Sequence, residues 1–491
     1  MWQAREQLEK ADQLRQQGQL DRAESICYPL TQRYPDFVAA LHTLGLIYLD
    51  KRNFERALDC LVRAQMLDPN NWMTLTALAL AYLRLGAKEM AARTLDRALK
   101  IRPEDASIHA SLGEIYREQR EYEIAQQAYQ KALALDRNLE SAAIGLALCL
   151  SALGRYSEAA SVLEGSLRRG HRSLNLLNVM ATLPRQALSA NLLAALESLS
   201  MNRPEQDAES RNTLALVQAA VLHMTGRYAK AWECLEEANR SLFAEHEPML
   251  REDVVRQEKS LARLRDTLIK PLSTTNDPIS LFVLGASRSG KSSLEHLLAS
   301  LDRVKAGYEI PTIEDALHRT FQSVALPVSR YLEDLPTEFL PAFRDNYLED
   351  LARRAGSARI FTSTLSHRIH DACIIASVIP NVRFVLIRRD LQDTALRIFM
   401  TKYLRGNSYS YDLKSIARYL QWYNKMMDLI AEKLSEIVLV VTYENMIADS
   451  RTILRQVANV AGLSVRNGTI PELVDDRGVA THYREQIGIL L

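Results

Sequence analysis

A chain of 491 residues is longer than one hydrophobic core usually serves, so we expect at least two domains. Its 61 Lys and Arg residues balance 60 Asp and Glu residues, which leaves no general field for binding nucleic acid or an anionic membrane. The five cysteines are scattered and form no C-x-x-C pair, a usage typical of reduced cysteines in a cytoplasmic protein. The sequence shows no signal-peptide core and no long apolar run, so we expect a cytoplasmic location without a membrane span.

The first half of the sequence repeats with a step of 34 residues. Small residues follow this step in two series, Ala11, Gly45, Ala79, Gly113 and Ala147, and Ala23, Ala57, Ala91, Ala125 and Ala159. Pro35, Pro69 and Pro103 keep the same step, and each can end a helix because its ring cannot continue one. Small residues at fixed offsets let helices approach closely, so the pattern predicts stacked helix pairs. It resembles the tetratricopeptide repeat, which has this period.

The repeat weakens between residues 171 and 211, where Pro184 and Pro204 interrupt it, and we expect a degenerate helical pair there. The pattern returns at Ala219, Gly226 and Ala231, and a charged helical stretch at about residues 245–269 would cap the array. The predicted first domain, an all-α solenoid, covers residues 1–269. Solenoid surfaces usually hold peptides or proteins, so we expect a protein or peptide partner in the repeat groove and leave the oligomeric state open.

Residues 270–278 form a short polar segment bounded by prolines, which predicts a linker. After it, apolar strand candidates at residues 279–284, 359–364, 382–387 and 437–441 alternate with helical stretches. Strands that alternate with helices favour a parallel sheet covered by helices on both faces. The predicted second domain, residues 279–491, is therefore an α/β domain.

The first of these strands leads into a sequence that suits a bound anion. Residues 285–292 match G-x-x-x-x-G-K-[ST], the nucleotide-binding P-loop. A strand that turns at glycines into a helix points several backbone N–H groups at one place, with the positive end of the helix dipole behind them. We therefore expect a phosphate or sulfate group at this loop.

Two further stretches bring charge toward the same edge of the sheet. The turn at residues 307–311 carries the carboxylate of Glu309. The strand at residues 383–387 ends in Arg388, Arg389 and Asp390, and guanidinium groups suit bidentate contacts with phosphate.

Five motifs of the second half resemble, in order, those of the sulfotransferase domain found downstream of tetratricopeptide arrays in bacterial proteins. That family is similar to protein-tyrosine sulfotransferases. The matching segments are residues 285–295 (G-A-S-R-S-G-K-S-S-L-E), 306–311 (A-G-Y-E-I-P), 383–394, 409–413 (Y-S-Y-D-L) and 441–450.

The resemblance implies a sulfotransferase-like P-loop fold and transfer of a sulfuryl group from 3'-phosphoadenosine-5'-phosphosulfate to an acceptor hydroxyl, with no metal. The 5'-phosphosulfate would be held by the loop, and the predicted donor-binding residues there are Arg288, Ser289, Gly290, Lys291, Ser292 and Ser293. Arg389 would hold the 3'-phosphate, and Glu309 would take the acceptor proton as general base. Arg288 and Glu309 are the predicted catalytic residues.

The sequence departs from the family pattern at positions that carry chemistry. Lys291 stands where the family has threonine, and Arg397 stands where it has a serine; we expect this arginine to bind the 3'-phosphate as well. Ser363 and Thr364 replace an aspartate and a lysine. Two alternatives therefore stay open: a catalytically impaired scaffold that uses its repeats for protein binding, and a kinase or ATPase that uses a nucleoside triphosphate. For the latter, Asp390 is the nearest candidate to hold Mg²⁺.

Overall fold

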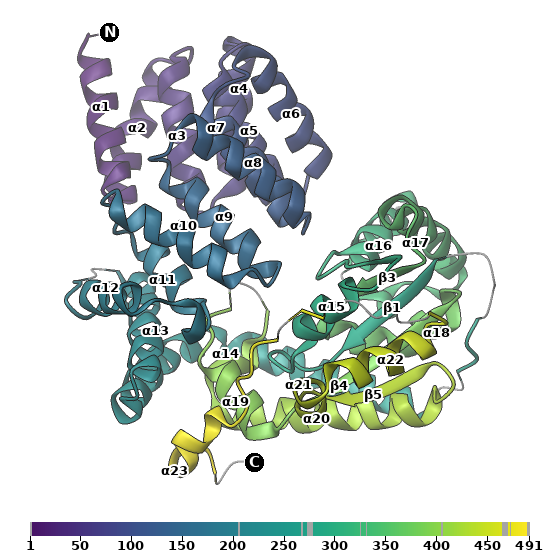
Figure 1. The fold of residues 1–491 in the computed structure, drawn as a ribbon. Helices are drawn as coiled ribbons and strands as arrows, with labels where there is room; N and C mark the ends of the chain where they lie inside the picture. The colour runs from purple at the N-terminus through teal and green to yellow at the C-terminus, as the bar shows by residue number, and fades with distance from the viewer. Residues whose placement is uncertain are drawn as a thin grey trace. The chain divides into compact units, whose positions relative to one another are not determined.

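A computed structural model describes residues 2–204, 207–266, 269–272, 278–324, 326–329, 331–403, 406–463, 470–471 and 473–488. The chain forms two compact units, Met1–His171 and Arg172–Leu491, and each is described by itself (Figure 1). Residues 273–277 of the predicted linker lie outside the described residues. The linker and the domain boundaries on either side of it therefore stay predictions.

The first unit is a stack of paired helices, which confirms the predicted all-α solenoid (Figure 1). The helices are α1 (Trp2–Gln16), α2 (Leu20–Arg33), α3 (Val38–Asp50), α4 (Phe54–Leu67), α5 (Trp72–Arg84), α6 (Lys88–Ile101), α7 (Ala106–Glu118), α8 (Tyr122–Leu135), α9 (Glu140–Ala152) and α10 (Tyr156–Arg168). As the prolines predict, α2, α4 and α6 end two residues before Pro35, Pro69 and Pro103.

The packing explains why small residues recur in this unit. A Cβ atom placed on Gly113 of α7 would lie 2.8 Å from the ring of Tyr129, which belongs to α8. The same ring donates a hydrogen bond from its hydroxyl to Glu114 Oε2 at 3.1 Å. The small residue thus makes room for a large side chain of the next helix, which fills the space between helices at interior packing density.

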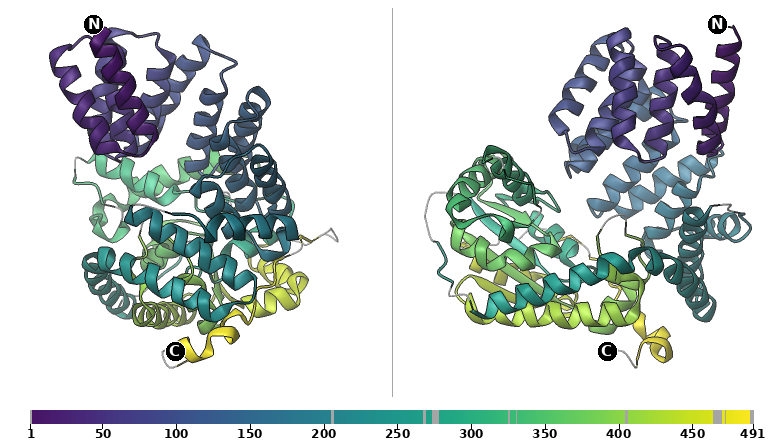
Figure 2. Two further views of the ribbon diagram at one scale, coloured as in Figure 1. Left: turned by 90° about the vertical axis from the view of Figure 1, so that its left-hand side faces the viewer. Right: turned by 180° about the vertical axis from the view of Figure 1, so that it is seen from behind.

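The second unit begins with more helices: α11 (Leu174–Thr182), α12 (Ala190–Met201), α13 (Ala208–Met224) and α14 (Tyr228–Asp266). The stretch predicted as a separate cap is the second half of α14, which runs through Pro248 without a break. Its inner face packs along α20 (Leu413–Lys433), as Figure 2 shows from behind. Asn239 donates to the carbonyl of Phe399 at 2.8 Å, and Trp422 donates to the carbonyl of Gln257 at 2.8 Å. These buried contacts join α14 to the α/β part of the same unit.

The α/β part is built on a parallel five-stranded sheet with the order β2-β3-β1-β4-β5. The strands are β1 (Ile279–Leu284), β2 (Val304–Lys305), β3 (Ile360–Ser363), β4 (Val382–Arg388) and β5 (Val438–Thr442). Four of them confirm the predicted strands, and β2 is too short to give an apolar run. The central strand β1 lies between β3 and β4, so the loop that follows it emerges at the middle of the sheet.

Helices cover both faces of this sheet, as predicted. The helices of the α/β part are α15 (Lys291–Ala299), α16 (Thr312–Ser323), α17 (Leu340–Ala355), α18 (Ala372–Val378), α19 (Leu391–Phe399), α20, α21 (Tyr443–Ala448), α22 (Ser450–Val460) and α23 (Arg484–Ile487), the last of which lies away from the sheet (Figure 1). Alternate residues of β1 enter different cores: Phe282 and Leu284 pack on one side, Leu281 and Val283 on the other. Among the described residues, none of the helices combines the length and apolar character needed to cross a membrane.

Candidate functional site

The loop between β1 and α15 has the backbone shape of an anion site. Gly290 lies directly before α15 with a φ of 96°, and a Cβ atom on it would lie 2.3 Å from the ring of Tyr443. Only glycine fits this conformation and this contact. The N–H groups of Lys291, Ser292 and Ser293 begin the helix without an acceptor inside it, and Gly290 at the N-cap has no side chain to accept from them. N–H groups in this position are suited to contact an anion.

The loop lysine lies across the loop itself. Lys291 is buried and donates from Nζ to the carbonyl oxygen of Ala286 at 2.8 Å. The pKa of this amine is lowered to about 8. Burial is the main cause and Arg288 adds to it, whereas Glu309 acts in the opposite direction. The charge of Lys291 thus interacts both with the predicted base and with the predicted phosphosulfate ligand.

The serines of the loop differ in their hydrogen bonds. The hydroxyl groups of Ser287 and Tyr403 share a hydrogen bond at 2.8 Å. Ser289 is 2% exposed, and its Oγ has no hydrogen-bond partner among the described residues. A buried polar atom without a partner is costly unless a ligand or water supplies one. The hydroxyl of Ser289 therefore fits a site that takes up an anion.

The turn that carries Glu309 is held from two elements. Tyr308 has a φ of 49°, and its N–H donates to Glu295 Oε1 of α15 at 2.8 Å. From β3 and the residue after it, Thr362 accepts from the N–H of Gly307 at 3.1 Å, while the N–H of Thr364 donates to the carbonyl of Tyr308 at 3.0 Å. A left-handed conformation at a bulky residue is strained, and such strain persists only where the surroundings fix it.

Glu295 is itself an unusual group at this turn. It is completely buried, and besides Tyr308 it accepts a short hydrogen bond from the hydroxyl of Thr362. Burial raises the pKa of Glu295 to about 7, although these hydrogen bonds act to lower it. The residue links the helix after the loop to the turn before α16.

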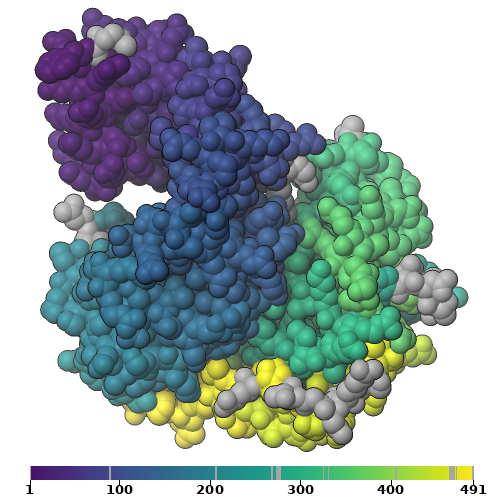
Figure 3. Space-filling view, turned by 45° about the horizontal axis from the view of Figure 1, so that its top comes forward, coloured from purple at the N-terminus to yellow at the C-terminus, as the bar shows by residue number. Residues whose placement is uncertain are grey.

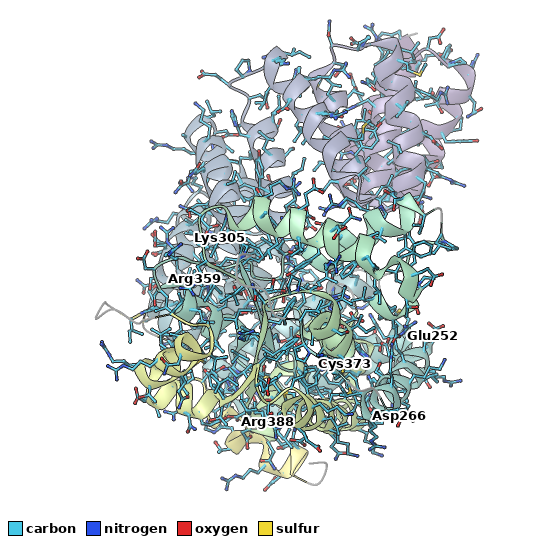
Figure 4. The ribbon with its side chains drawn as sticks, turned by 90° about the vertical axis from the view of Figure 1, so that its right-hand side faces the viewer. Glu252, Asp266, Lys305, Arg359, Cys373 and Arg388 are labelled. Carbon is cyan, nitrogen blue, oxygen red and sulfur yellow. The ribbon has the colours of Figure 1, made fainter. Side chains whose placement is uncertain are left out.

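The two arginines at the end of β4 point to different places. Arg389 donates from Nη1 to the carbonyl of Arg288 at 3.4 Å, and its guanidinium lies 4.3 Å from the centre of the Tyr443 ring. Arg388, labelled in Figure 4, pairs with Asp428 of α20 instead. The structure thus brings Arg389 to the loop and leaves Arg388 outside the site.

Arg397 of α19 joins Arg389 through a shared carboxylate. Asp476 lies 3.0 Å from Arg389 Nη2 through Oδ1 and 2.6 Å from Arg397 Nη2 through Oδ2. Burial lowers the pKa of Arg397, as do the nearby Arg389 and Arg288, while Asp476 raises it. The two guanidinium groups that were predicted to hold the 3'-phosphate therefore lie beside the same carboxylate.

The candidate for Mg²⁺ has a structural role. Asp390 directly precedes α19 and accepts from the N–H of Asp393 at 2.9 Å, which is the geometry of a helix N-cap. Among the residues the structure describes, no three His, Cys, Asp or Glu side chains are grouped so that they could hold a metal ion.

Known protein families match both halves of the chain. A model of the sulfotransferase family matches residues 278–467, and models of the tetratricopeptide repeat match residues 42–106 and 106–139. The chain thus contains a sulfotransferase-family domain and tetratricopeptide repeats. The matched family region contains the loop, the Glu309 turn, Arg389 and Arg397.

The individual relatives that the chain matches are distant. An uncharacterized protein of Aquifex aeolicus (strain VF5) is 22% identical over 247 residues, which are 48% of this chain and 32% of the relative. The BBSome complex member BBS4 of Bos taurus is 24% identical over 186 residues, which are 36% of this chain and 35% of the relative. The chain thus spans about a third of the length of these curated relatives.

Among solved structures, a thermophilic tetratricopeptide-repeat protein of Thermus thermophilus is 24% identical, with a TM-score of 0.34, and the match covers 35% of this chain and 94% of that one. PilF of Pseudomonas aeruginosa is 22% identical with the same TM-score, over 41% of this chain and 90% of that one. Similarity at this level carries no argument about function.

Two residues of the site were not predicted from the sequence. Glu295 stands in a recognised motif, but only its burial against Thr362 shows what it contacts. Asp476 lies in the C-terminal segment, and nothing local to it in the sequence indicates two arginine partners.

Proposed function

We propose that this protein transfers a sulfuryl group from 3'-phosphoadenosine-5'-phosphosulfate to a hydroxyl group of a peptide or protein. The observation that carries the proposal is the convergence of the uncapped N–H groups at the start of α15, Arg288 and Arg389 on one loop. Membership of the sulfotransferase family supports the same reaction. We also propose a cytoplasmic location.

The loop suits the negative charge of the donor. The N–H groups of Lys291, Ser292 and Ser293, with the hydroxyl of Ser289 and the side chain of Arg288, would bind the 5'-phosphosulfate. Fixed donors of this kind stabilise charge that develops on the bridging and non-bridging oxygens during transfer. Lys291 would leave the carbonyl of Ala286 and add a point charge.

The second phosphate of the donor would lie at Arg389 and Arg397. Both guanidinium groups already point to a single carboxylate, so their tips lie at a distance that one anion can bridge. Charge-assisted bonds of this kind are about twice as strong as neutral ones. This pair would distinguish a nucleotide with a 3'-phosphate from one without it.

Glu309 would act as general base. During transfer the acceptor hydroxyl gives its proton to this carboxylate, the acceptor oxygen forms a bond to sulfur, and the bond between sulfur and the 5'-phosphate oxygen breaks. Adenosine 3',5'-bisphosphate leaves with the electron pair of that bond. A positioned carboxylate contributes about 10²–10⁴-fold to such a step.

The residues that replace the family's aspartate and lysine support the turn. Thr364 bonds Tyr308 through its N–H, and Ser363 is buried at the end of β3. The absence of charged side chains at Ser363 and Thr364 keeps one alternative open, a catalytically impaired protein that binds the nucleotide and uses its repeats as a scaffold. The kinase or ATPase alternative is weakened because Asp390 is engaged as an N-cap.

The acceptor would be presented by the repeats. Tetratricopeptide arrays generally bind other proteins, and this one carries strongly exposed apolar side chains such as Met66 and Met73. Flexible, polarisable methionines suit a surface that accepts varied partners.

Calorimetric titration with adenosine 3',5'-bisphosphate and, separately, with ATP and Mg²⁺ tests the proposal. Tight binding of the bisphosphate without a response to ATP supports the sulfotransferase function, and the reverse result supports a kinase or ATPase. Transfer of label from the donor to a panel of hydroxyl acceptors then separates an active enzyme from an impaired scaffold.

A further inference from the structure

Asp476 occupies a built anion site. Its Oδ1 accepts from Arg389 Nη2 at 3.0 Å and from the hydroxyl of Tyr443 at 2.5 Å, and its Oδ2 lies 2.6 Å from Arg397 Nη2. Arg389 also donates to the backbone carbonyl of Asp476 at 2.8 Å. Two cations and a phenol from three different elements thus converge on one carboxylate.

The electrostatics of this group hold Asp476 in its charged form. Burial alone would raise the pKa of Asp476, but Arg397 and Arg389 outweigh it and keep the pKa below its usual value. A phosphate group placed beside a charged carboxylate would meet strong repulsion in this partly buried environment. The same donors therefore bind either the carboxylate or a phosphate.

The backbone beside Asp476 is held by contacts of other residues, so the Asp476 side chain can leave the two arginines while the segment stays in place. The next turn has an anchor of its own, because Asp393 of α19 accepts from the N–H of Gly478 at 2.6 Å and from that of Ala480 at 2.8 Å. The same carboxylate also lies 3.8 Å from Arg389 Nη2, a longer contact than the one that Asp476 makes. On the other side, Asp475 pairs with Arg477 at 2.7 Å, and the charge of Arg389 reaches it only as one of several smaller influences that lower its pKa.

We propose that Asp476 is an internal competitor of the nucleotide: its carboxylate occupies the site of the 3'-phosphate, and nucleotide binding replaces it at Arg389 and Arg397. The proposal rests on the function proposed above. It makes Asp476 a determinant of nucleotide affinity, because each binding event exchanges one anion for another. Through Asp476, the segment of residues 473–488, yellow in Figure 3, would affect a site formed by Arg389, which follows β4, and by Arg397 of α19.

The test uses the full chain with Asp476→Asn and, as a matched control, Asp475→Asn. Asparagine keeps the size of the side chain and removes its charge. Asp476→Ser is measured alongside, so that the conclusion does not depend on the folding of one variant. Each protein is titrated with adenosine 3',5'-bisphosphate and with adenosine 5'-phosphate, which lacks the 3'-phosphate.

We expect Asp476→Asn and Asp476→Ser to bind the bisphosphate about 10-fold more tightly than the wild type, because a charge-assisted contact no longer competes. The affinity for adenosine 5'-phosphate and the behaviour of Asp475→Asn should not change.

Equal or weaker bisphosphate binding in both Asp476 variants, with normal binding by the wild type, overturns the competitor role and leaves the proposed function intact. A parallel gain for adenosine 5'-phosphate overturns the assignment to the 3'-phosphate. No bisphosphate binding by any of the proteins overturns the proposed function and this inference together.

Discussion

Arg389 donates from Nη1 to the carbonyl oxygen of Arg288 at 3.4 Å, which joins the end of β4 to the loop after β1. The two residues are neighbours only because these strands pair in parallel, with Leu284 of β1 opposite Leu386 of β4. The guanidinium group of Arg389, after β4, therefore lies near the loop that leads from β1 to the N–H groups at the start of α15.

Replacing Arg389 by alanine should weaken binding of adenosine 3',5'-bisphosphate by about 10- to 100-fold, the range expected for loss of charge-assisted hydrogen bonds. Calorimetry measures the affinity. Arg388→Ala is the matched control, because this adjacent arginine pairs with Asp428 away from the loop. Equal losses in the two variants would mean that general charge, and not position, governs binding.

Glu309→Ala should leave bisphosphate binding intact and abolish sulfuryl transfer, because a general base acts on the acceptor and not on the nucleotide. Both quantities are measured on the same preparation, the first by calorimetry and the second with labelled donor. If nucleotide binding is lost together with transfer, the carboxylate supports the pocket and the assignment as base is wrong.

Bisphosphate affinity should fall as the pH rises from about 7 to about 9. Burial lowers the pKa of Lys291 to about 8, so its amine loses the proton across this range, while a bound anion favours the protonated form. The expected decrease is about tenfold. Lys291→Thr, which removes the titrating amine, should show a flatter profile; the same slope in both proteins would contradict a contact between Lys291 and the nucleotide.

Gly290→Ala should destabilise the protein by about 1–3 kcal/mol, because alanine at a positive φ is strained and the new methyl group would overlap the Tyr443 ring. Chemical denaturation measures the change. Gly356→Ala is a useful comparison: Gly356 also has a positive φ, 59°, but nothing lies within 4 Å of an added Cβ. A cost no larger than that of Gly356→Ala would show that Tyr443 does not pack on the loop.

The stability difference between wild type and Glu295→Gln should depend on pH. Burial raises the pKa of Glu295 to about 7, above its ordinary value of 4.5. The protonated carboxyl therefore contributes its full stabilisation below pH 4.5, and this contribution is lost as the pH rises through about 7. Melting temperatures at about pH 5 and about pH 8 should favour the wild type more at the lower pH, and an unchanged difference would place Glu295 outside the buried core.

Local sequence predicts those parts of the structure that depend on local physics. The loop after β1 follows from two glycines between an apolar strand and a helix, and the repeat helices follow from a fixed step of small residues and prolines. The two-residue strand β2 has no local signal. The continuity of α14 through Pro248 has no local signal either: the proline removes a hydrogen bond, and the helix on both sides of it contacts residues 408–411, through His246 with Tyr411 and Asp253 with Ser408.

Contacts between distant segments lie beyond such prediction. Asp476 is 87 residues from Arg389 in the chain, and Glu295 is 67 residues from Thr362. Their roles emerge only when the sheet brings the ends of β3, β1 and β4 together. The resemblance to a family supplies the expected ligand, whereas the structure supplies the carboxylate that competes with it.

A crystal structure of the protein with adenosine 3',5'-bisphosphate tests the central claim most directly. We predict the 5'-phosphate on the N–H groups of Lys291, Ser292 and Ser293, with the 3'-phosphate bound to Arg389 and Arg397 in place of Asp476. Density for the nucleotide elsewhere, with Lys291 still bonded to Ala286 and Asp476 still between the two arginines, would contradict the account.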